Sequence, residues 1–121
     1  MLNTAHKSAK GRILVVDDTE EFRYMAERAL RGAGYDVKIA EDYQQALDLL
    51  AGPEPLDLML TDIVMPGGIN GFALARMRRL DLKLLYMTAY DVPMNEAVAK
   101  ILRKPLADNE LVQEVKLALA A

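Results

Sequence analysis

Five polar side chains suited to phosphate chemistry stand at the ends of short apolar runs in this sequence: Asp17, Asp18, Asp62, Thr88 and Lys104. Clustered carboxylates repel one another and take up protons near neutral pH unless a cation neutralises them. Mg2+ prefers oxygen ligands and keeps several waters, which leaves room for phosphate oxygens. A carboxylate can attack phosphorus to form an aspartyl phosphate, while an ammonium and a hydroxyl bind the other phosphate oxygens. The set predicts Mg2+-dependent phosphoryl transfer, provided that the fold brings the five side chains together.

The apolar runs that precede these side chains are predicted to be strands. Four short apolar runs stand out: 13–16, 56–60, 82–87 and 101–102. The first three are rich in Val, Ile, Leu and Met and hardly alternate between apolar and polar residues. Continuous apolar strands are typical of a parallel sheet that is covered on both faces. Residues 36–40 do alternate, with Val37 and Ile39 apolar between polar neighbours. This segment is therefore predicted to be an edge strand with one solvated face.

Segments with helical spacing of apolar residues separate the strands. They lie at 22–33, 43–50, 70–80 and 108–119. The third is expected to bury Ala73, Leu74, Met77 and Leu80. The last is expected to begin at Asp108, a residue type that is favoured at the N-cap. Between residues 91 and 100, Pro93 and a weak helical period leave room for only about two turns of helix.

The alternation of strands and helices predicts an α/β fold with a parallel sheet and right-handed crossovers. A flavodoxin-like, doubly wound sheet of five strands in the order 2-1-3-4-5, with helices on both faces, suits the 121 residues. Open sheets of this kind bind ligands beyond the carboxyl ends of their strands. The five polar side chains all stand at such ends, so we expect them to meet.

Four segments of the chain resemble the receiver domain of two-component response regulators: ILVVDD at 13–18, LMLTDIVMPGGINGFALA at 58–75, MTA at 87–89 and KPL at 104–106. The resemblance runs from about Arg12 to the C-terminus. It implies that Asp62 is the phosphoacceptor and that Asp18 binds Mg2+ directly. It also implies that Asp17 acts on the metal largely through water, and that the backbone carbonyl of Val64 is the remaining metal ligand.

The same resemblance assigns the other polar residues at the strand ends. Thr88 matches the hydroxyl of the family's switch, and Lys104 matches the lysine that pairs with phosphate. The Lys104–Pro105 peptide bond is then expected to be cis. Met65-Pro66 and Gly71 match the turn that leads into the third helix.

Two departures from the family pattern concern the segment between Thr88 and Lys104, which is shorter than usual. The fourth helix is therefore expected to be short or irregular, which affects the usual dimer mode. Ile101 stands where the family often has an aromatic switch residue, and Tyr90 is a possible partial substitute.

Val64 and Tyr90 flank the route of the hydrolytic water and offer no acid or amide, so we expect slow autodephosphorylation.

The amino-acid composition excludes several classes of function. The chain has no cysteine, a single histidine at His6 and a net charge of −3, which argues against thiol chemistry, multi-histidine metal sites and direct nucleic-acid binding. No apolar run approaches the roughly 20 residues that span a bilayer. We expect a flexible leader at 1–11 and a receiver domain at 12–121, in the cytoplasm, as a stand-alone monomer or weak dimer. The expected partners are a histidine kinase or histidine phosphotransfer protein and a downstream protein target.

Two other functions belong to different classes. A Mg2+-dependent phosphohydrolase with an aspartyl nucleophile typically carries D-x-D-x-[TV], which residues 17–21 do not match. A flavin-binding protein of the same fold has a hydroxyl- and glycine-rich loop where this chain has acids. We therefore expect catalysis only of the protein's own phosphorylation and dephosphorylation. Gly67-Gly68 is interpreted as a turn, and Arg76, Arg78 and Arg79 as a solvated helix face.

Overall fold

The computed structural model describes residues 10–66, 70–79 and 81–121. Strands and helices alternate along these ranges. Their bounds are β1 Arg12–Val16, α1 Glu20–Gly32, β2 Asp36–Ala40, α2 Tyr43–Ala51, β3 Leu58–Asp62, α3 Asn70–Met77, β4 Lys83–Thr88, η1 Met94–Glu96, β5 Ile101–Arg103 and α4 Asp108–Ala120. The label η1 denotes a short 3-10 helix.

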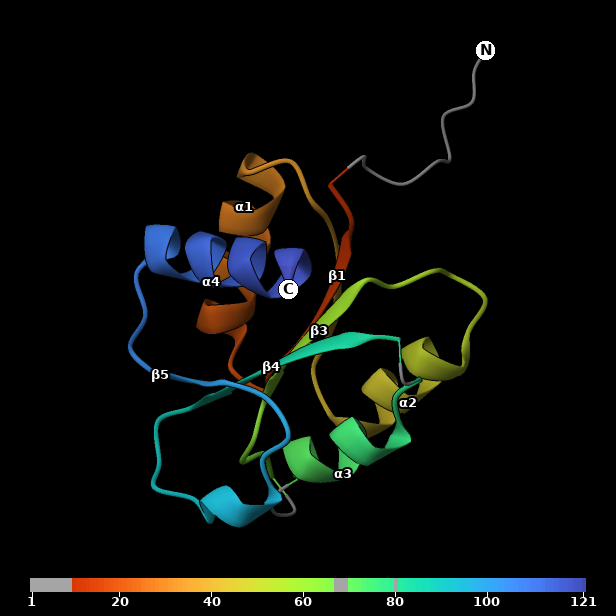
Figure 1. Ribbon diagram of the computed structural model, residues 1–121, viewed down its shortest axis with the longest axis vertical. Helices are drawn as coiled ribbons and strands as arrows, with labels where there is room; N and C mark the ends of the chain where they lie inside the picture. Colours follow the sequence, from red (N-terminus) through yellow and green to blue (C-terminus); the bar gives the residue numbers. More distant parts are fainter. Residues whose placement is uncertain (1–9, 67–69, 80) are drawn as a thin grey trace.

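The five strands form one parallel sheet in the order β2-β1-β3-β4-β5 (Figure 1). This confirms the doubly wound fold that the alternation of elements predicts. The register pairs Val16 with Thr61, Asp62 with Met87, and Thr88 with Arg103. The carboxyl ends of four adjacent strands therefore lie at one edge of the sheet.

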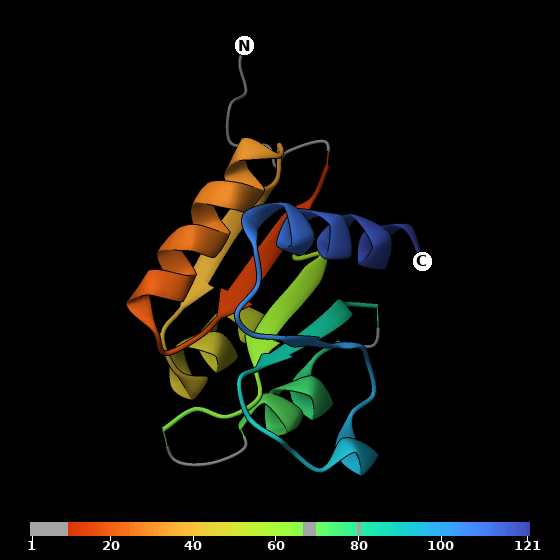
Figure 2. The ribbon, with the colours of Figure 1, turned by 90° about the vertical axis from the view of Figure 1, so that its left-hand side faces the viewer.

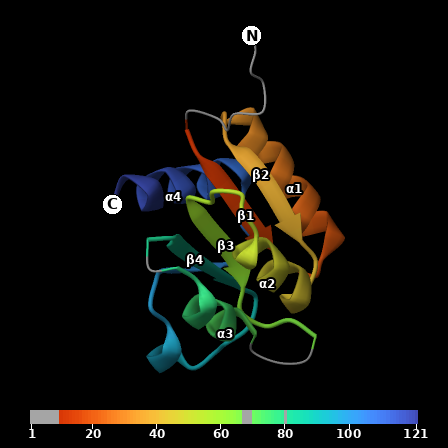
Figure 3. The same cartoon turned by 90° about the vertical axis from the view of Figure 1, so that its right-hand side faces the viewer.

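Helices cover both faces of the sheet. Figure 2 shows α1 and α4 beside each other on one face, and Figure 3 shows α2 and α3 on the opposite face. Successive strand residues point to opposite faces, so each strand contributes to two separate cores. Ile13 and Val15 pack under α1 and α4, whereas Leu14 and Val16 pack under α2 and α3. We call these the α1–α4 face and the α2–α3 face.

The burial of α3 and β2 differs from the sequence-based prediction. Leu74 is buried as expected, but Met77 is 61% exposed, and Phe72 fills the core instead. Ala73, which was also predicted to be buried, is only half-buried, and Met77 is the last residue of α3. In β2, Val37 is buried, but Ile39 is 39% exposed because it lies near the end of an edge strand. Leu80 lies outside the described residues.

The first turn of α4 also corrects a prediction. Ala107, not Asp108, is the N-cap residue, and Asp108 is the first residue of the helix. The Ala107 backbone N–H donates a hydrogen bond of 2.9 Å to the carboxylate of Glu110. A methyl side chain cannot accept a hydrogen bond from the free N–H groups of the first turn. Glu110 therefore supplies the only side-chain oxygen that we find bonded to this cap among the described residues.

The segment between β4 and β5 is irregular, as predicted. Its only regular turn among the described residues is η1, which spans three residues. The buried Tyr86 connects this segment to the sheet, because its hydroxyl accepts a hydrogen bond of 3.4 Å from the Val98 N–H. Ile101 pairs with Tyr86 in the sheet and packs on the α2–α3 face.

Some predictions fall on parts of the chain outside the description. Most of the predicted leader at 1–11, with His6, lies outside the described residues, as does Gly67-Gly68. Arg76 and Arg79 are exposed as expected. Arg78 is half-buried and donates hydrogen bonds to the backbone carbonyls of Ala75 and Leu82. No helix in the described ranges combines the length and apolar character required to cross a membrane.

Candidate functional site

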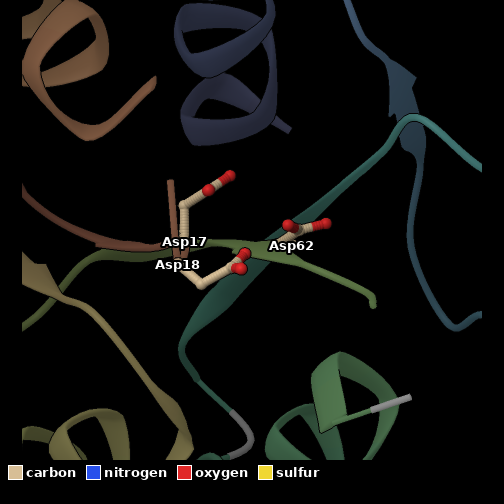
Figure 4. A group of neighbouring side chains, drawn as sticks. All are labelled: Asp17, Asp18 and Asp62. Carbon is tan, nitrogen blue, oxygen red and sulfur yellow. The ribbon is translucent and has the colours of Figure 1, made fainter. Parts of the chain in front are cut away.

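Three carboxylates meet at the carboxyl edge of the sheet. Asp17 and Asp18 follow β1, and Asp62 is the last residue of β3. Each offers an oxygen that lies within 4.8 Å of oxygens on the other two. Figure 4 shows the three side chains grouped where β1 and β3 end. The parallel pairing of these two strands thus places the acids together, as the sequence predicts.

Asp17 is fully buried, and its carboxylate is held on both oxygens. Oδ1 accepts a hydrogen bond of 2.7 Å from the Thr19 backbone N–H, and Oδ2 lies 2.5 Å from Nζ of Lys104. The Arg23 guanidinium donates to the backbone carbonyl of Asp17 at 2.9 Å. A buried carboxylate is destabilising unless its oxygens are paired and hydrogen-bonded, as they are here. Asp17 is therefore fixed in place, whereas Asp18 is exposed.

Lys104 connects β5 to the acids. Its ammonium lies 2.5 Å from Asp17 and 3.4 Å from Asp62, and its side chain is only 17% exposed. Burial lowers the pKa of Lys104, but the hydrogen bonds and charges of Asp17 and Asp62 outweigh that effect and raise it above its ordinary value. The side chain is therefore a permanent cation. The following peptide bond to Pro105 is cis, as predicted.

Asp62 is a weaker acid than an ordinary aspartate. Burial is the largest cause and raises its pKa from 3.8 to about 6, with the charge of Lys104 opposing and those of Asp17 and Asp18 reinforcing the shift. Three acids beside one ammonium leave excess negative charge. Hard divalent cations bind sets of carboxylate oxygens of this kind, so the donor set fits Mg2+.

Thr88 is buried at the end of β4, one residue beyond the partner of Asp62 in the sheet register. Its hydroxyl oxygen accepts a hydrogen bond of 3.0 Å from the Tyr90 N–H. The Tyr90 carbonyl in turn accepts a hydrogen bond of 2.6 Å from Arg103. The sheet register thus places Thr88 at the same edge as the acids, and its hydroxyl oxygen is bonded by the turn that follows.

A cavity of about 770 Å³ adjoins the acids. Asp18, Asp62 and Lys104 line it, together with Val64 and Tyr90. The remaining wall is partly apolar and includes Phe22, Met25, Met65, Pro105 and Leu106. Four of the predicted polar residues, Asp17, Asp18, Asp62 and Lys104, are therefore brought together, and Val64 borders the same space.

Gly71 is required by a close approach of two backbone segments. Its N–H donates a hydrogen bond of 3.0 Å to the Ile63 carbonyl. A Cβ atom on Gly71 would lie 2.4 Å from the Asp62 carbonyl oxygen and 2.6 Å from the Ile63 Cα. Only glycine allows α3 to begin so close to the end of β3. Gly71 thereby fixes the backbone that carries Asp62.

Sequence reasoning missed two residues at this site. The ring centroid of Phe22 lies 4.6 Å from Nζ of Lys104, although the helical period of this segment assigned Phe22 only to the core. Arg103 holds the turn after Thr88 through the Tyr90 carbonyl. An aromatic residue four positions after Asp18, in the first turns of the helix, was the available signal for Phe22.

Comparison with known proteins identifies the family. The sequence model of the response regulator receiver domain matches residues 13–116. The chain belongs to this family. "Response regulator MprA" from Mycolicibacterium vanbaalenii is 37% identical over 118 residues, which cover 89% of this chain and 50% of the relative. The chain thus spans about half the length of the curated relatives it matches.

Solved receiver structures agree with the fold. The receiver domain of the hybrid histidine kinase CckA is 30% identical with a TM-score of 0.75, covering 90% of this chain and 99% of that one. The chemotaxis response regulator CheY4 of Vibrio cholerae is 27% identical with a TM-score of 0.78, covering 89% and 98%. This protein is therefore a receiver domain of the two-component signalling type with a flavodoxin-like fold.

Proposed function

We propose that this receiver domain accepts a phosphoryl group on Asp62 from a phosphohistidine of a histidine kinase or histidine phosphotransfer protein. The observation that carries the proposal is the meeting of three carboxylates with one buried ammonium. Asp17, Asp18 and Asp62 lie within 4.8 Å of one another, and Lys104 lies 3.4 Å from Asp62. One oxygen of Asp62 attacks phosphorus and the P–N bond to the histidine breaks. The other ring nitrogen of the phosphohistidine already carries a proton, so the histidine leaves as neutral imidazole.

Asp18, Asp62 and the backbone carbonyl of Val64 would hold Mg2+, with Asp17 acting on it largely through water. The bound ion would supply charge neutralisation for the acids and for a phosphoryl oxygen. Asp62 must be ionised to attack, and its pKa of about 6 leaves it mainly ionised at neutral pH. Lys104 pairs with a second phosphoryl oxygen, and the Thr88 hydroxyl leaves the Tyr90 turn to donate to a third.

The proposed output is contact with a downstream protein rather than enzymatic turnover. The new phosphoryl group withdraws Thr88 from Tyr90 and so alters the turn that Arg103 also holds. This coupling carries the phosphorylation state from the carboxyl edge to the irregular segment 89–100. Ile101 replaces the family's usual aromatic residue, so we assign this coupling to Tyr90.

The phosphorylated form is expected to lose its phosphoryl group slowly. Val64 and Tyr90 border the cavity beside Asp62, and neither side chain carries an acid or amide that could orient the attacking water. Following the decay of phosphorylated protein over time checks this expectation. A half-life of seconds at neutral pH would contradict it.

The proposal is tested by incubating the protein with acetyl phosphate in the presence and absence of Mg2+. We expect one added phosphoryl group by intact mass, dependent on Mg2+ and lost in Asp62→Asn. Asp81→Asn, which removes an exposed acid between α3 and β4, is the matched control and should be phosphorylated normally. Labelling that survives Asp62→Asn would overturn the assignment of the acceptor.

The same reaction separates this proposal from the phosphohydrolase alternative. A receiver stops at one phosphoryl group per chain and releases phosphate only through decay of that group. Multiple turnovers of small phosphate esters by sub-stoichiometric protein would favour the hydrolase. Transfer from a phosphorylated histidine phosphotransfer protein to Asp62 would then establish the class of donor.

A further inference from the structure

We propose that Phe22 is a positioning residue for Lys104, and that the face of its ring holds the ammonium ready for the incoming phosphoryl group. The inference rests on the proposed function of Asp62 as phosphoacceptor and adds a residue that the sequence motif does not contain. Phe22 lies in α1, whereas Lys104 follows β5, so the contact joins two elements that are distant in sequence.

The geometry is that of a cation–π contact. The Lys104 Nζ atom lies 4.6 Å from the centroid of the Phe22 ring, within the roughly 6 Å range over which a ring face attracts a cation. Both residues line the cavity beside Asp62. The Lys104 side chain is only 17% exposed, so little water competes for its charge. The attraction between a ring and a cation is stronger in such a place than at an exposed surface.

The other cation–ring contacts among the described residues are looser. Lys10 lies 5.7 Å from the ring of Tyr35, and the Arg28 guanidinium lies 5.8 Å from the ring of Tyr24. Neither pair lines the cavity beside the acids. The contact at Phe22 is thus both the shortest of the three and the one that involves a group of the site.

Lysine needs such a contact because its side chain is flexible and its ammonium is a point charge. Hydrogen bonding alone draws the ammonium toward Asp17, at 2.5 Å, rather than toward Asp62, at 3.4 Å. The ring attracts the cation without consuming a donor hydrogen directed at an oxygen. A ring also excludes water, which strengthens the attraction between Lys104 and a phosphoryl oxygen. An aliphatic side chain would fill the space without attracting the charge.

The test replaces Phe22 with mono-, di- and trifluorinated phenylalanine, which weaken the negative face of the ring stepwise with little change in shape. The rate of phosphorylation by acetyl phosphate at saturating Mg2+ should fall with each step, by about 3- to 30-fold overall. Mg2+ affinity, measured separately, should stay within about twofold because the carboxylates are untouched. A residue that only fills the core would give a flat series.

Phe72 supplies the matched control, since it is the other phenylalanine of the chain and packs edge-to-face on Tyr86 instead of on a cation. The same fluorinated series at Phe72 should leave the rate unchanged. Phe22→Tyr should keep most of the rate because it retains an aromatic face, whereas Phe22→Leu should lose it. Thermal unfolding of each variant shows that rate differences arise in folded protein.

The outcomes separate this inference from the function on which it rests. If the unsubstituted protein takes up no phosphoryl group with Mg2+, the proposed function fails and the inference fails with it. If the unsubstituted protein is phosphorylated but the rate is independent of fluorination at Phe22, only the inference is overturned. Equal rates for Phe22→Leu and Phe22→Tyr would overturn it as well.

Discussion

The two faces of the sheet are covered very differently. On the α1–α4 face, two helices of 13 residues each pack side by side. On the α2–α3 face, the helices have nine and eight residues, and the rest of the cover comes from partly buried side chains of the irregular segment, Val92, Ala97 and Ala99. One face is thus a regular layer, whereas the other relies on close backbone contacts and single side chains.

The difference matters because the candidate site draws on both faces. Lys104 lies against Phe22 of α1, on the regular side. The backbone that follows Asp62 instead contacts Gly71 at the start of α3, on the other side. Damage to the α2–α3 face should therefore affect the site through the position of Asp62. Damage to the α1–α4 face should affect it through Lys104.

The largest expected effect is that of Gly71→Ala. The added Cβ would lie 2.4 Å from the Asp62 carbonyl oxygen and 2.6 Å from the Ile63 Cα. Both of these atoms belong to the backbone, so the clash can be relieved only if β3 or α3 moves. We expect a loss of about 2 to 3 kcal/mol in the free energy of unfolding. Urea unfolding measures it, and phosphorylation by acetyl phosphate should fall in the same variant.

Gly32→Ala is the matched control for Gly71→Ala on the regular face. A Cβ at Gly32 meets nothing within 4 Å, and the residue ends α1, so alanine should leave stability unchanged or raise it by up to about 1 kcal/mol. Equal effects of the two substitutions would contradict the contrast between the faces.

The next effect concerns Asp62, where the faces meet. Because its pKa is raised to about 6, the native state binds this proton more tightly than the unfolded chain does. Ionised Asp62 therefore lowers stability above about pH 6, and this penalty disappears as the pH falls toward 4. With a chelator at pH 7.5, Asp62→Asn should raise the free energy of unfolding by on the order of 1 to 2 kcal/mol, allowing for solvent screening.

Three comparisons check the Asp62→Asn prediction. The gain should vanish at about pH 4, and Mg2+ should stabilise the wild type more than the variant because the variant lacks one carboxylate. Asp48→Asn, on an exposed turn of α2, should show neither behaviour. A gain in stability that is independent of pH between 4 and 7.5 would refute the electrostatic explanation.

Tyr86→Phe should have a smaller effect, confined to the irregular side. The substitution removes the hydroxyl that accepts the Val98 N–H at 3.4 Å, yet keeps the ring that packs on Phe72. We expect a loss of about 1 kcal/mol or less. Hydrogen exchange should become faster at Val98 while β1 and α1 remain protected. Tyr24→Phe, at a residue that is 67% exposed, is the control. If the two variants gave the same exchange pattern, the hydrogen bond between Tyr86 and Val98 would not be what holds the irregular segment.

The contrast between the faces also explains what the sequence could predict. The parallel sheet and the meeting of Asp17, Asp18 and Asp62 follow from the apolar runs and parallel pairing. The strand order was predicted from the flavodoxin-like fold that suits the chain length. The contact between Phe22 and Lys104 depends on how α1 is rotated against β5, which periodicity does not specify. The predicted burial of Met77 was wrong as well, because the apolar spacing does not show that α3 ends at this residue. The close approach at Gly71 is a tertiary constraint that the sequence marks only by a glycine.

The smallest expected effect tests a weak point on the otherwise regular face. Ala107 caps α4 with an extended backbone that suits an N-cap, but its methyl group accepts no hydrogen bond. Ala107→Thr supplies a hydroxyl, and Ala107→Val has nearly the same shape without one. The threonine variant should exceed the valine variant by about 0.5 to 1 kcal/mol in the free energy of unfolding. The N-cap of α2 on the other face gives the reverse comparison. Asp42 already accepts a hydrogen bond of 2.8 Å from the Gln45 N–H, so Asp42→Ala should lower the free energy of unfolding by a similar amount. If threonine and valine at position 107 gave equal stability, the side-chain carboxylate of Glu110 would already satisfy this helix start, and the apparent weakness of the α4 cap would have no energetic consequence.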